Sequence, residues 1–589
     1  MGRYTLATKR RIAIAVVCIV AVIAAFVVRL VDIQVVRADQ LVADSLAKTG
    51  AASTIYALRG DIVDTNGVVM ASSVTLFDIT VSPRDVTDIT RTAEDGTTTT
   101  ETVAESLGKI GAITGQTVEE LQGIISDALA KDPDSNFAYL IKGVGYEKYR
   151  QLVALKIWWL YPQRTSGRVY PLGAVAGNVV GYVGTDHHGL EGVELAEDDC
   201  LTGTNGTQAY QRSKDGVPLP GTTVVTQPAK PGGTLKLTID SDLNWYLQQL
   251  VASQVQKTGA QWGIVMVTEA KTGKIRAIAE SSAPDPNAPS ESDRGSRAFE
   301  YPFEPGSIFK PLTAATLIDQ GKADPYTHVL APYWYYPSNG AKIKDATPHD
   351  PFPLTLTGVL QQSSNTGLSI LGESLSAETR YDYLDKLGFG HKTGLNFPGE
   401  EAGVLHPWQQ WDNQSWYTTM FGQAVQASAV QIAQAYQTLA NGGVKLPLQL
   451  TEGCTYPDGT TTRVPEPSSG ERVFSQEAAQ ETVGMMETVV TDGFLADDLE
   501  IPGYRVAAKS GTGEIWEDGK LKSTFFSSMA GMVPADNPEY VITVHLNQPQ
   551  VQRTSESAAP VFQEAVLQVA KKYGIPPATT PPPDYPGYY

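Results

Sequence analysis

The distribution of apolar residues first separates the N-terminus from the rest of the chain. An uncharged run, IAIAVVCIVAVIAAFVV, extends from Ile12 to Val28 and follows several basic residues. It has the length of a short membrane-spanning helix, and Arg29 can snorkel so that the span reaches Val36. The basic flank predicts a cytoplasmic tail at 1–11, a transmembrane anchor at 12–36 and an external location for everything after it. A cleaved signal peptide is the alternative, which the length of the run disfavours.

Strand, helix and turn patterns alternate over the next part of the chain. Residues 34–50 have the pattern of a juxtamembrane helix. RGDIVDTNGVVMASS alternates polar and apolar positions around Asn66-Gly67, which predicts a β-hairpin. Residues 91–102 predict a polar, low-complexity loop, and helical patterns fill 103–160. A turn-rich stretch follows, and QPAKPGG at 227–233 predicts a domain boundary.

From Thr234 onward the pattern predicts an α+β domain. A strand and a helix precede WGIVMVTEAKTGKIRAIAE, which reads as two strands joined at Thr272-Gly273. Helices dominate to about residue 490, and RVAAKSGTGEIW, KSTFFSSMAGMVP and YVITVHLNQP then predict three strands before a closing helix. Strands from both ends with helices between them indicate an antiparallel sheet with helices on both faces. The Pro-rich tail at 576–589 is predicted to be disordered.

Composition excludes several classes of function. The net charge of -19 argues against a nucleic-acid binder, which needs a basic face. The three cysteines form no disulfide framework and show no zinc-ligand spacing, so no metal and no cofactor is predicted. Cys200 and Cys454 could pair in an exported protein, but their spacing favours two free thiols.

Three short motifs carry the candidate chemistry, and context must choose among their copies. S-x-x-K occurs at Ser45–Lys48 and at Ser307–Lys310. Ser45 follows the apolar run directly and reads as an ordinary helix-surface serine. Ser307 follows a Pro-Gly turn and opens a helix, so that it shares one face with Lys310 and lies at the positive end of the helix dipole. A helix-capping serine beside a surface lysine fits this motif alone equally well.

The other two motifs follow in the same domain. K-[ST]-G occurs at Lys271, in a turn, at Lys392, without a strand pattern after it, and at Lys509, inside a predicted strand. S-x-N occurs at Ser363–Asn365. Only the third K-[ST]-G presents a lysine and hydroxyls from a strand, and Gly511 there lets a substrate approach the backbone. The order Ser307, Ser363, Lys509 makes the joint match specific where each part is weak.

These residue types suit acyl transfer through serine. A serine hydroxyl needs a neighbouring base, and Lys310 can serve if burial and the like charge of Lys509 lower its pKa. Asn365 is expected to fix Lys310 and the substrate amide, and Ser363 to relay a proton to the departing amine.

Substrate binding is expected from the strand motif. The segment predicted to bind substrate is Ser510, Gly511 and Thr512. The hydroxyls of Ser510 and Thr512 are expected to bind a terminal carboxylate, and Lys509 is expected to supply positive potential. The backbone N–H groups of Ser307 and Thr512 would form the oxyanion hole.

With these residues placed, the chain resembles the class B penicillin-binding proteins, and within them the FtsI-type septal peptidoglycan D,D-transpeptidases. The resemblance rests on the three motifs and on RLVDIQ, RGDIVDTNG, GRVYPLGAVAGNVVGYVG, GLEGVE, LTGVLQQSSN and FGQAVQASAVQIAQAY. It implies a non-catalytic pedestal at 50–230 and a penicillin-binding, serine β-lactamase-like transpeptidase domain at 234–575. Ile308, Ser510 and Gly513 depart from the commoner family residues without removing a reactive group.

The resemblance also implies a reaction and partners. It implies acylation of Ser307 by D-Ala-D-Ala stem peptides, acylation by β-lactams, and work at the division septum beside an FtsW-type membrane glycosyltransferase and other division proteins. An elongation-type transpeptidase shares every catalytic motif and stays open. A β-lactamase or D,D-carboxypeptidase is disfavoured by the pedestal and anchor, a β-lactam sensor by the short region before the span, and a degenerate scaffold by the retained motifs.

Overall fold

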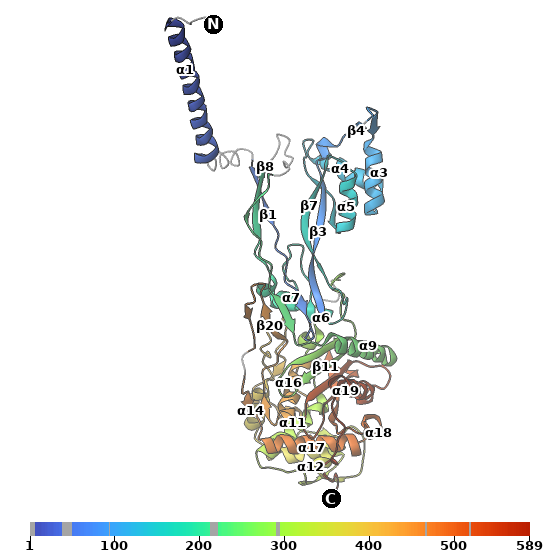
Figure 1. Cartoon of the computed structure of the whole chain (residues 1–589). Helices are drawn as coiled ribbons and strands as arrows, with labels where there is room; N and C mark the ends of the chain where they lie inside the picture. Colours follow the sequence, from blue (N-terminus) through green and yellow to red (C-terminus); the bar gives the residue numbers. More distant parts are fainter. Residues whose placement is uncertain are drawn as a thin grey trace. The chain divides into compact units, whose positions relative to one another are not determined.

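The computed structural model describes residues 6–37, 50–92, 95–211, 222–289, 295–465, 468–517 and 520–589 (Figure 1). The chain forms two compact units, Met1–Leu58 with Gly203–Pro231, and Arg59–Thr202 with Gly232–Tyr589. The predicted juxtamembrane helix lies almost wholly outside the described residues, as does the S-x-x-K copy at Ser45.

The smaller unit combines a long apolar helix with a narrow sheet. Helix α1 (Leu6–Val31) continues into a π-helical segment, η1 (Asp32–Val36). Among the described residues, Arg10–Val36 is the one helix long and apolar enough to cross a membrane, with a mean hydropathy of 3.0 and no burial within the protein. Strands β1 (Gly50–Ile55), β8 (Gly206–Gln211) and β9 (Val224–Gln227) pair antiparallel.

The predicted hairpin around Asn66-Gly67 is confirmed in the larger unit. Strand β2 (Ile62–Val63) turns back into β3 (Val69–Val81). Asp64 accepts the backbone N–H groups of Asn66 and Val68, both at 2.8 Å, and Gly67 adopts φ +85°. The turn therefore forms because Asp64 satisfies its donors and glycine tolerates its left-handed conformation.

Two predictions for the following segment were wrong. Residues 91–102 are not a loop: β4 (Ile89–Thr92) pairs with β5 (Thr98–Glu101), because β-branched threonines favour extended backbone. The helical pattern over 103–160 is interrupted by β6 (Ala138–Val144) and β7 (Leu160–Val169), which both pair with β3. Tertiary pairing overrides local propensity there.

Three helices occupy the rest of that segment. Helices α3 (Val103–Thr114) and α4 (Val118–Lys131) each begin with a complete capping box, from Thr102 and from Thr117, and α5 is Tyr146–Ala154. Their apolar faces share a core with β3, β6 and β7 that includes the fully buried Trp159.

The predicted antiparallel sheet of the second domain is confirmed. Its strand order is β12-β11-β25-β24-β23, and every neighbouring pair is antiparallel. The strands are β11 (Trp262–Glu269), β12 (Ile275–Glu280), β23 (Ala507–Glu517), β24 (Lys520–Val533) and β25 (Tyr540–Asn547). Strands from the start and the end of the domain therefore meet in one sheet, as the sequence pattern predicts.

Helices cover both faces of this sheet, because alternate residues of each strand point to opposite sides. Val265 and Val267 of β11 pack in one core with α9 (Ser241–Thr258) and α19 (Ala559–Tyr573). Ile264 and Met266 pack in another with α16 (Ala429–Ala440) and α11 (Lys310–Asp319). The sheet is thus the rigid centre on which α11 and β23 are held.

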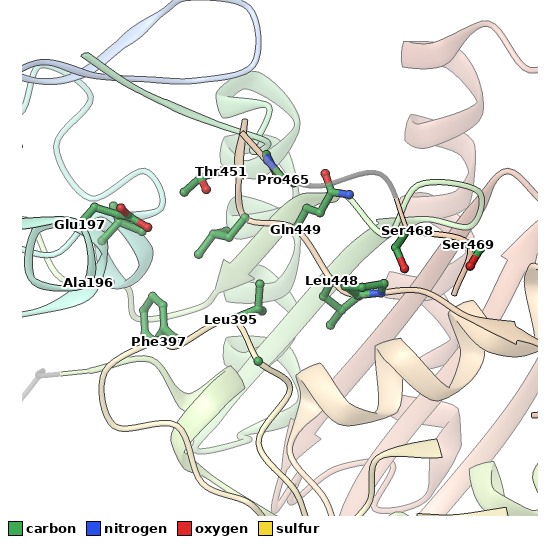
Figure 2. A pocket seen from close by; sticks show the side chains of 14 residues that line it. Ala196, Glu197, Leu395, Phe397, Leu448, Gln449, Thr451, Pro465, Ser468 and Ser469 are labelled. Carbon is green, nitrogen blue, oxygen red and sulfur yellow. The ribbon is translucent and has the colours of Figure 1, made fainter. Parts of the chain in front are cut away.

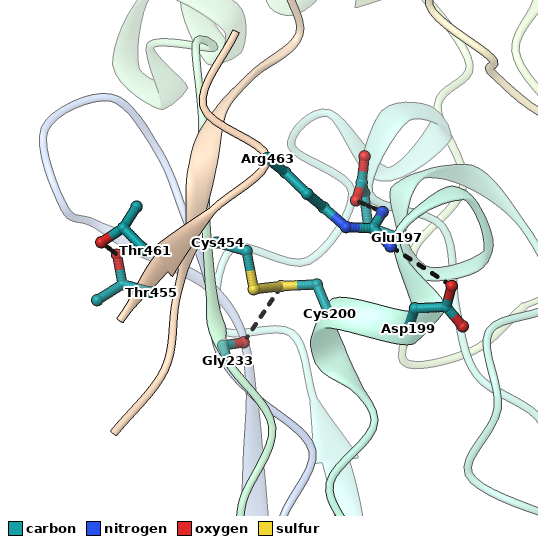
Figure 3. The surroundings of a disulfide bond; sticks show 8 residues. All are labelled: Glu197, Asp199, Cys200, Gly233, Cys454, Thr455, Thr461 and Arg463. Carbon is teal, nitrogen blue, oxygen red and sulfur yellow. Dashed lines mark hydrogen bonds and ion pairs between the residues drawn. A yellow bond between two sulfur atoms is a disulfide. The ribbon is translucent and has the colours of Figure 1, made fainter. Parts of the chain in front are cut away.

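A disulfide bond corrects the prediction of free thiols. Cys200 of α8 (Asp198–Leu201) and Cys454 of β20 (Thr451–Thr455) are bonded, although they are 254 positions apart in the sequence (Figure 3). Strand β20 pairs with β10 (Thr234–Leu237), and the Gly233 N–H just before β10 donates to the Cys200 carbonyl at 2.8 Å, so β10 brings the two cysteines together. Arg463 adds ion pairs to Glu197 and Asp199 beside the bond.

The tail at 576–589 is not disordered, which corrects a further prediction. It lies against α12 (Leu356–Gln361), α17 (Gln476–Asp492) and β16 (Phe352–Thr355), and Figure 1 places the C-terminal end beside α12 and α17. Its carbonyl groups accept hydrogen bonds from Thr355.

The remaining elements are α6 (Gly177–Val180), α7 (Gly192–Ala196), α10 (Arg297–Glu300), α13 (Asn365–Gly372), α14 (Ala377–Leu387), α15 (Ser415–Thr418), α18 (Ala496–Leu499), β13 (His328–Ala331), β14 (Trp334–Tyr335), β15 (Ile343–Lys344), β17 (Val404–Leu405), β18 (Val425–Gln426), β19 (Val444–Lys445), β21 (Thr461–Thr462) and β22 (Glu471–Arg472).

Candidate active site

Ser307 lies in a short 3-10 turn, η4 (Gly306–Phe309), that continues directly into α11. The side chains of Ile308, Leu312 and Ala315 are 0%, 1% and 0% exposed, so this apolar face packs the helix into the core. Tyr436 donates its hydroxyl to the Ile308 carbonyl at 2.7 Å. Ser307 itself is partly exposed. The fold therefore anchors the turn from behind and leaves the serine hydroxyl at the surface of the site.

Strand β23 packs its backbone directly against this turn. A Cβ atom on Gly511 would lie 2.9 Å from the Ile308 nitrogen, and one on Gly306, which has φ +61°, would lie 2.4 Å from the Thr512 carbonyl oxygen. Gly513 is as tight, because a Cβ there would lie 2.0 Å from the Glu304 carbonyl oxygen. Only glycine allows this approach. The structure thus brings the predicted Lys509–Thr512 segment to the predicted serine.

Lys310 is completely buried and contacts the third motif. Its Nζ donates to the Ser363 carbonyl oxygen and, at 3.2 Å, to the Ser363 hydroxyl. Burial lowers the pKa of Lys310 to about 7, and the charge of Asp345 opposes that shift. The amine is therefore partly neutral near neutral pH, which is the state a base needs.

Lys509 is the second buried amine. Burial, reinforced by the charge of Lys310, lowers its pKa well below the usual lysine value. Its Nζ donates to the Ser510 carbonyl at 3.0 Å, and Ser510 is 3% exposed. Burial is thus the larger cause of the lowered pKa of Lys509, with the charge of Lys310 as the second cause, whereas the lowered pKa of Lys310 comes from burial and not from the predicted charge of Lys509.

Ser363 occupies a strained backbone position between α12 and α13. Its φ is +54°, in the left-handed region that a non-glycine residue rarely adopts. Such a conformation costs on the order of 1–3 kcal/mol and persists only where the surroundings enforce it. Here it directs the Ser363 carbonyl to the Lys310 amine.

Asp345 enforces this turn and was missed by the sequence analysis. Its carboxylate accepts the backbone N–H groups of Asn365 at 2.5 Å and Thr366 at 3.0 Å, and the Ser364 hydroxyl at 2.7 Å. His349 contacts the same carboxylate at 3.0 Å. Asp345 therefore caps the start of α13. An aspartate in the turn-rich KIKDATPHD carries no periodic signal, so the sequence alone could not single it out.

Asn365 departs from its expected contacts. Its side-chain amide donates to the Lys344 carbonyl at 2.9 Å, whereas the hydrogen bonds of Lys310 go to Ser363. Asn365 thus ties the start of α13 to β15. It can act on Lys310 only indirectly, through the neighbouring Ser363 turn.

Glu304 is a further titratable group three residues before the serine. Burial raises its pKa to about 7, although the Ala424 N–H donates to its carboxylate at 3.1 Å. Its other carboxylate oxygen is buried with no hydrogen-bond partner. The site therefore contains two groups, Glu304 and Lys310, that change protonation near neutrality.

A cavity of about 600 Å³ is lined by a different set of residues (Figure 2). It is lined by α7, by the segment around Leu395 and Phe397 and by residues 447–451. None of the described site residues contributes to it, so it is not where the serine chemistry would occur. Among the residues that the structure describes, no cluster of His, Cys, Asp or Glu could hold a metal ion.

The chain matches two protein families. Residues 263–567 match the penicillin binding protein transpeptidase domain, and residues 54–237 match the penicillin-binding protein dimerisation domain. It is 31% identical to the penicillin-binding protein PbpB of Mycolicibacterium smegmatis, over 96% of this chain and 90% of that one. It is 28% identical to the peptidoglycan D,D-transpeptidase FtsI of Escherichia coli, over 95% and 91%.

Solved structures give the same likeness. A peptidoglycan synthetase from Bifidobacterium adolescentis has a TM-score of 0.73 and 31% identity, covering 92% of this chain and 100% of that one. Penicillin binding protein 3 of Mycobacterium tuberculosis, complexed with aztreonam, has a TM-score of 0.68 and 27% identity, covering 90% and 99%.

Proposed function

This chain belongs to the class B penicillin-binding proteins, and we propose that it is a septal peptidoglycan D,D-transpeptidase whose nucleophile is Ser307. One observation carries the proposal: the buried amine of Lys310, one helical turn from Ser307, is bonded to Ser363, while the Lys509–Thr512 strand packs against the serine turn. These contacts support the proposal that a hydroxyl, two amines and further hydroxyls act together at one site.

The proposed reaction has two half-reactions at Ser307. In the first, neutral Lys310 takes the hydroxyl proton as Ser307 Oγ attacks the penultimate D-Ala carbonyl of a stem peptide. The C–N bond to the terminal D-Ala breaks, and the proton passes to its amine through Ser363. In the second, the amine of a neighbouring stem attacks the Ser307 ester and gives its proton to Lys310, and Ser307 leaves as the hydroxyl.

The strand motif holds the substrate in this proposal. Ser510 and Thr512 hydrogen-bond the terminal carboxylate, and Lys509 is the nearest source of positive potential. The N–H groups of Ser307 and Thr512 stabilise the oxyanion, an effect worth roughly 2.7–4 kcal/mol per donor in serine enzymes. The packing of Gly306 against Thr512 supports this geometry, because it holds the two donors on facing segments. Gly511 lets substrate approach the strand, and Asn365 orients the substrate amide.

The domain organisation and location are part of the same proposal. Residues 50–230 serve as the pedestal, 234–575 as the transpeptidase domain and 12–36 as a single-pass anchor with a cytoplasmic N-terminus. The Cys200–Cys454 disulfide supports an external location, since disulfides persist outside the reducing cytoplasm. Lipid bilayer, β-lactams, stem peptides, an FtsW-type glycosyltransferase and other division proteins are the proposed partners.

Covalent labelling tests the proposal. Ser307→Ala should abolish labelling by a fluorescent penicillin, with mass spectrometry showing the adduct on Ser307 in the wild type. Ser45→Ala, in the other S-x-x-K copy, is the matched control and should label normally. Labelling that survives in Ser307→Ala refutes the nucleophile. Rapid loss of label from the wild type would indicate a β-lactamase instead, because a transpeptidase deacylates slowly.

A further inference from the structure

Two helices of the transpeptidase domain contain a glycine that faces the C-terminal tail. Gly358 lies in α12 and Gly484 in α17, although glycine is the poorest helix former after proline. A Cβ atom on Gly358 would lie 1.8 Å from the Gly587 carbonyl oxygen. One on Gly484 would lie 2.8 Å from the Tyr585 ring and 3.1 Å from Pro583. Both glycines therefore provide the space that residues 583–589 fill.

The tail is hydrogen-bonded to the chain that enters α12. The Thr355 N–H donates to the Gly587 carbonyl at 3.0 Å, and the Thr355 hydroxyl donates to the Pro586 carbonyl at 2.6 Å. Tyr588 forms an antiparallel bridge with Leu354, and the Tyr589 N–H donates to the Pro353 carbonyl at 3.2 Å. Proline lacks an N–H but keeps its carbonyl, so a Pro-rich segment can serve as the acceptor along a strand edge.

Aromatic side chains complete the seat of the tail. Tyr589 stacks on His328 with ring centroids 3.8 Å apart, and Tyr585 meets Tyr326 edge to face at 5.6 Å. Tyr585 also packs on the core that contains α12 and α13. Residues 583–589, called the strap below, thus make backbone, ring and close-packing contacts with one region.

That region leads directly to the Ser363 turn. Thr355 is the N-cap of α12, because its hydroxyl also accepts the Gly358 N–H at 3.0 Å. At the other end of α12, a Cβ on Gly587 would lie 1.9 Å from the buried Gln361 side chain. The strap therefore touches α12 at both ends, and α12 ends two residues before Ser363. The strained Ser363 backbone depends on such support.

We propose that the strap is a positioning element of the active site, which holds α12 so that the Ser363 carbonyl meets the Lys310 amine. The inference rests on the proposed function, since it concerns the base of the same acylation. It assigns a role in the reaction to a Pro- and Tyr-rich segment that contains none of the three catalytic motifs.

Gly358→Ala is the sharpest test, because it should expel the strap while favouring the helix. Gly123→Ala in α4 is the matched control: it makes the same change inside a helix, where a Cβ would meet nothing within 4 Å. The second-order rate of acylation by a fluorescent penicillin should fall at least tenfold in Gly358→Ala and stay unchanged in Gly123→Ala. A chain lacking residues 583–589 should show the same loss, and adding Gly358→Ala to it should cause no further loss.

The pH profile separates positioning from a loss of folded protein. Lys310 faces Lys509 of β23 and Asp345 before α13. If the Ser363 turn loosens and water reaches the amine, its pKa rises toward the value of a free lysine. The rise of the acylation rate with pH should then move to higher pH in Gly358→Ala, so that the loss shrinks in alkaline buffer. A smaller folded fraction alone would lower the rate without moving the profile.

Three outcomes would overturn the inference: wild-type acylation in Gly358→Ala and in the strapless chain, a lower rate with an unmoved pH profile, or an equal loss in Gly123→Ala. They are distinguishable from failure of the proposed function. If Ser307→Ala abolishes labelling while the strapless chain labels at the wild-type rate and pH, the function stands and the strap has no part in it.

Discussion

Two clusters of buried charge in the larger unit differ in how they are paired. In the first cluster, Glu194 of α7 is 0% exposed. It bonds Arg59 at 2.6 Å and Arg168 at 2.7 Å, and Arg59 also bonds Asp198 at 2.6 Å. In the candidate site, Lys310 and Lys509 are just as buried, but their amines donate to serine oxygens. No carboxylate in the described part of the chain forms an ion pair with either lysine.

This difference separates stabilisation from reactivity. A buried charge that is bonded to an opposite charge fixes the elements that carry the pair, as Arg59 and Glu194 join the start of β2 to α7. A buried charge whose hydrogen-bond partners are neutral loses its proton more easily, as the lowered pKa of Lys310 shows. The paired cluster is therefore suited to holding the fold and the unpaired one to moving protons.

Removing the Lys310 amine should have the largest of the expected effects, and it should lower the acylation rate without lowering the stability. We expect Lys310→Met to lower the rate of acylation by a fluorescent penicillin about 10³-fold, within the usual range for loss of a general base. The melting temperature should stay level or rise, because an apolar side chain replaces a buried amine. Lys322→Met, at an exposed lysine just after α11, is the control. Acylation within tenfold of the wild type would show that another base acts.

Breaking the paired cluster should lower the stability and leave the acylation rate nearly unchanged. Glu194→Gln leaves the buried Arg59 and Arg168 without their shared carboxylate, and we expect a loss of roughly 3–5 kcal/mol of unfolding free energy. Urea denaturation followed by tryptophan fluorescence measures it. The acylation rate per folded molecule should stay within twofold of the wild type. A stable Glu194→Gln protein with slow acylation would contradict the division of roles between the two clusters.

Local patterns predicted much of this molecule. WGIVMVTEAKTGKIRAIAE predicts two strands joined by a turn, which are β11 and β12, and the spacing of Ile308, Leu312 and Ala315 matches the buried face behind the serine. The sequence also singled out the motifs proposed to be catalytic, and two of them, at Ser307 and Lys509, lie on the helix start and the strand that their own neighbours specify.

What the sequence did not predict depends on distant partners. The Cys200–Cys454 bond forms because β20 pairs with β10, although the two cysteines are 254 positions apart in the sequence. Asp345 acquires its role from the start of α13, 20 positions later in the sequence, with β16 and α12 between them. The tail has the composition of a disordered segment, but Gly358 and Gly484 provide its seat from other elements. Such contacts leave no periodic signal in the segment itself.

The smallest expected effect is a difference between the two clusters in the pH at which each changes its protonation. Because Lys310 must be neutral to accept the serine proton, the second-order acylation rate should rise with pH around its pKa of about 7, falling close to tenfold per pH unit well below that value. The contribution of the paired cluster to stability should change at a much lower pH. Burial alone would raise the pKa of Asp198, but hydrogen bonds from His188, Gly189 and Arg59 lower it to about 2.

The stability that Asp198 contributes is therefore present above the pKa of a free aspartate and lost only as pH falls toward 2. The exposed His188 adds little near neutrality, since solvent screens its pairing. Between pH 6 and 8 the acylation rate should thus change, while the contribution of Asp198 to the unfolding free energy does not. Glu304 titrates in the same range, so Glu304→Gln decides the assignment: the rise with pH should persist in it and vanish in Lys310→Met. If the rise vanishes in Glu304→Gln instead, the carboxyl group controls the profile and the unpaired amine does not.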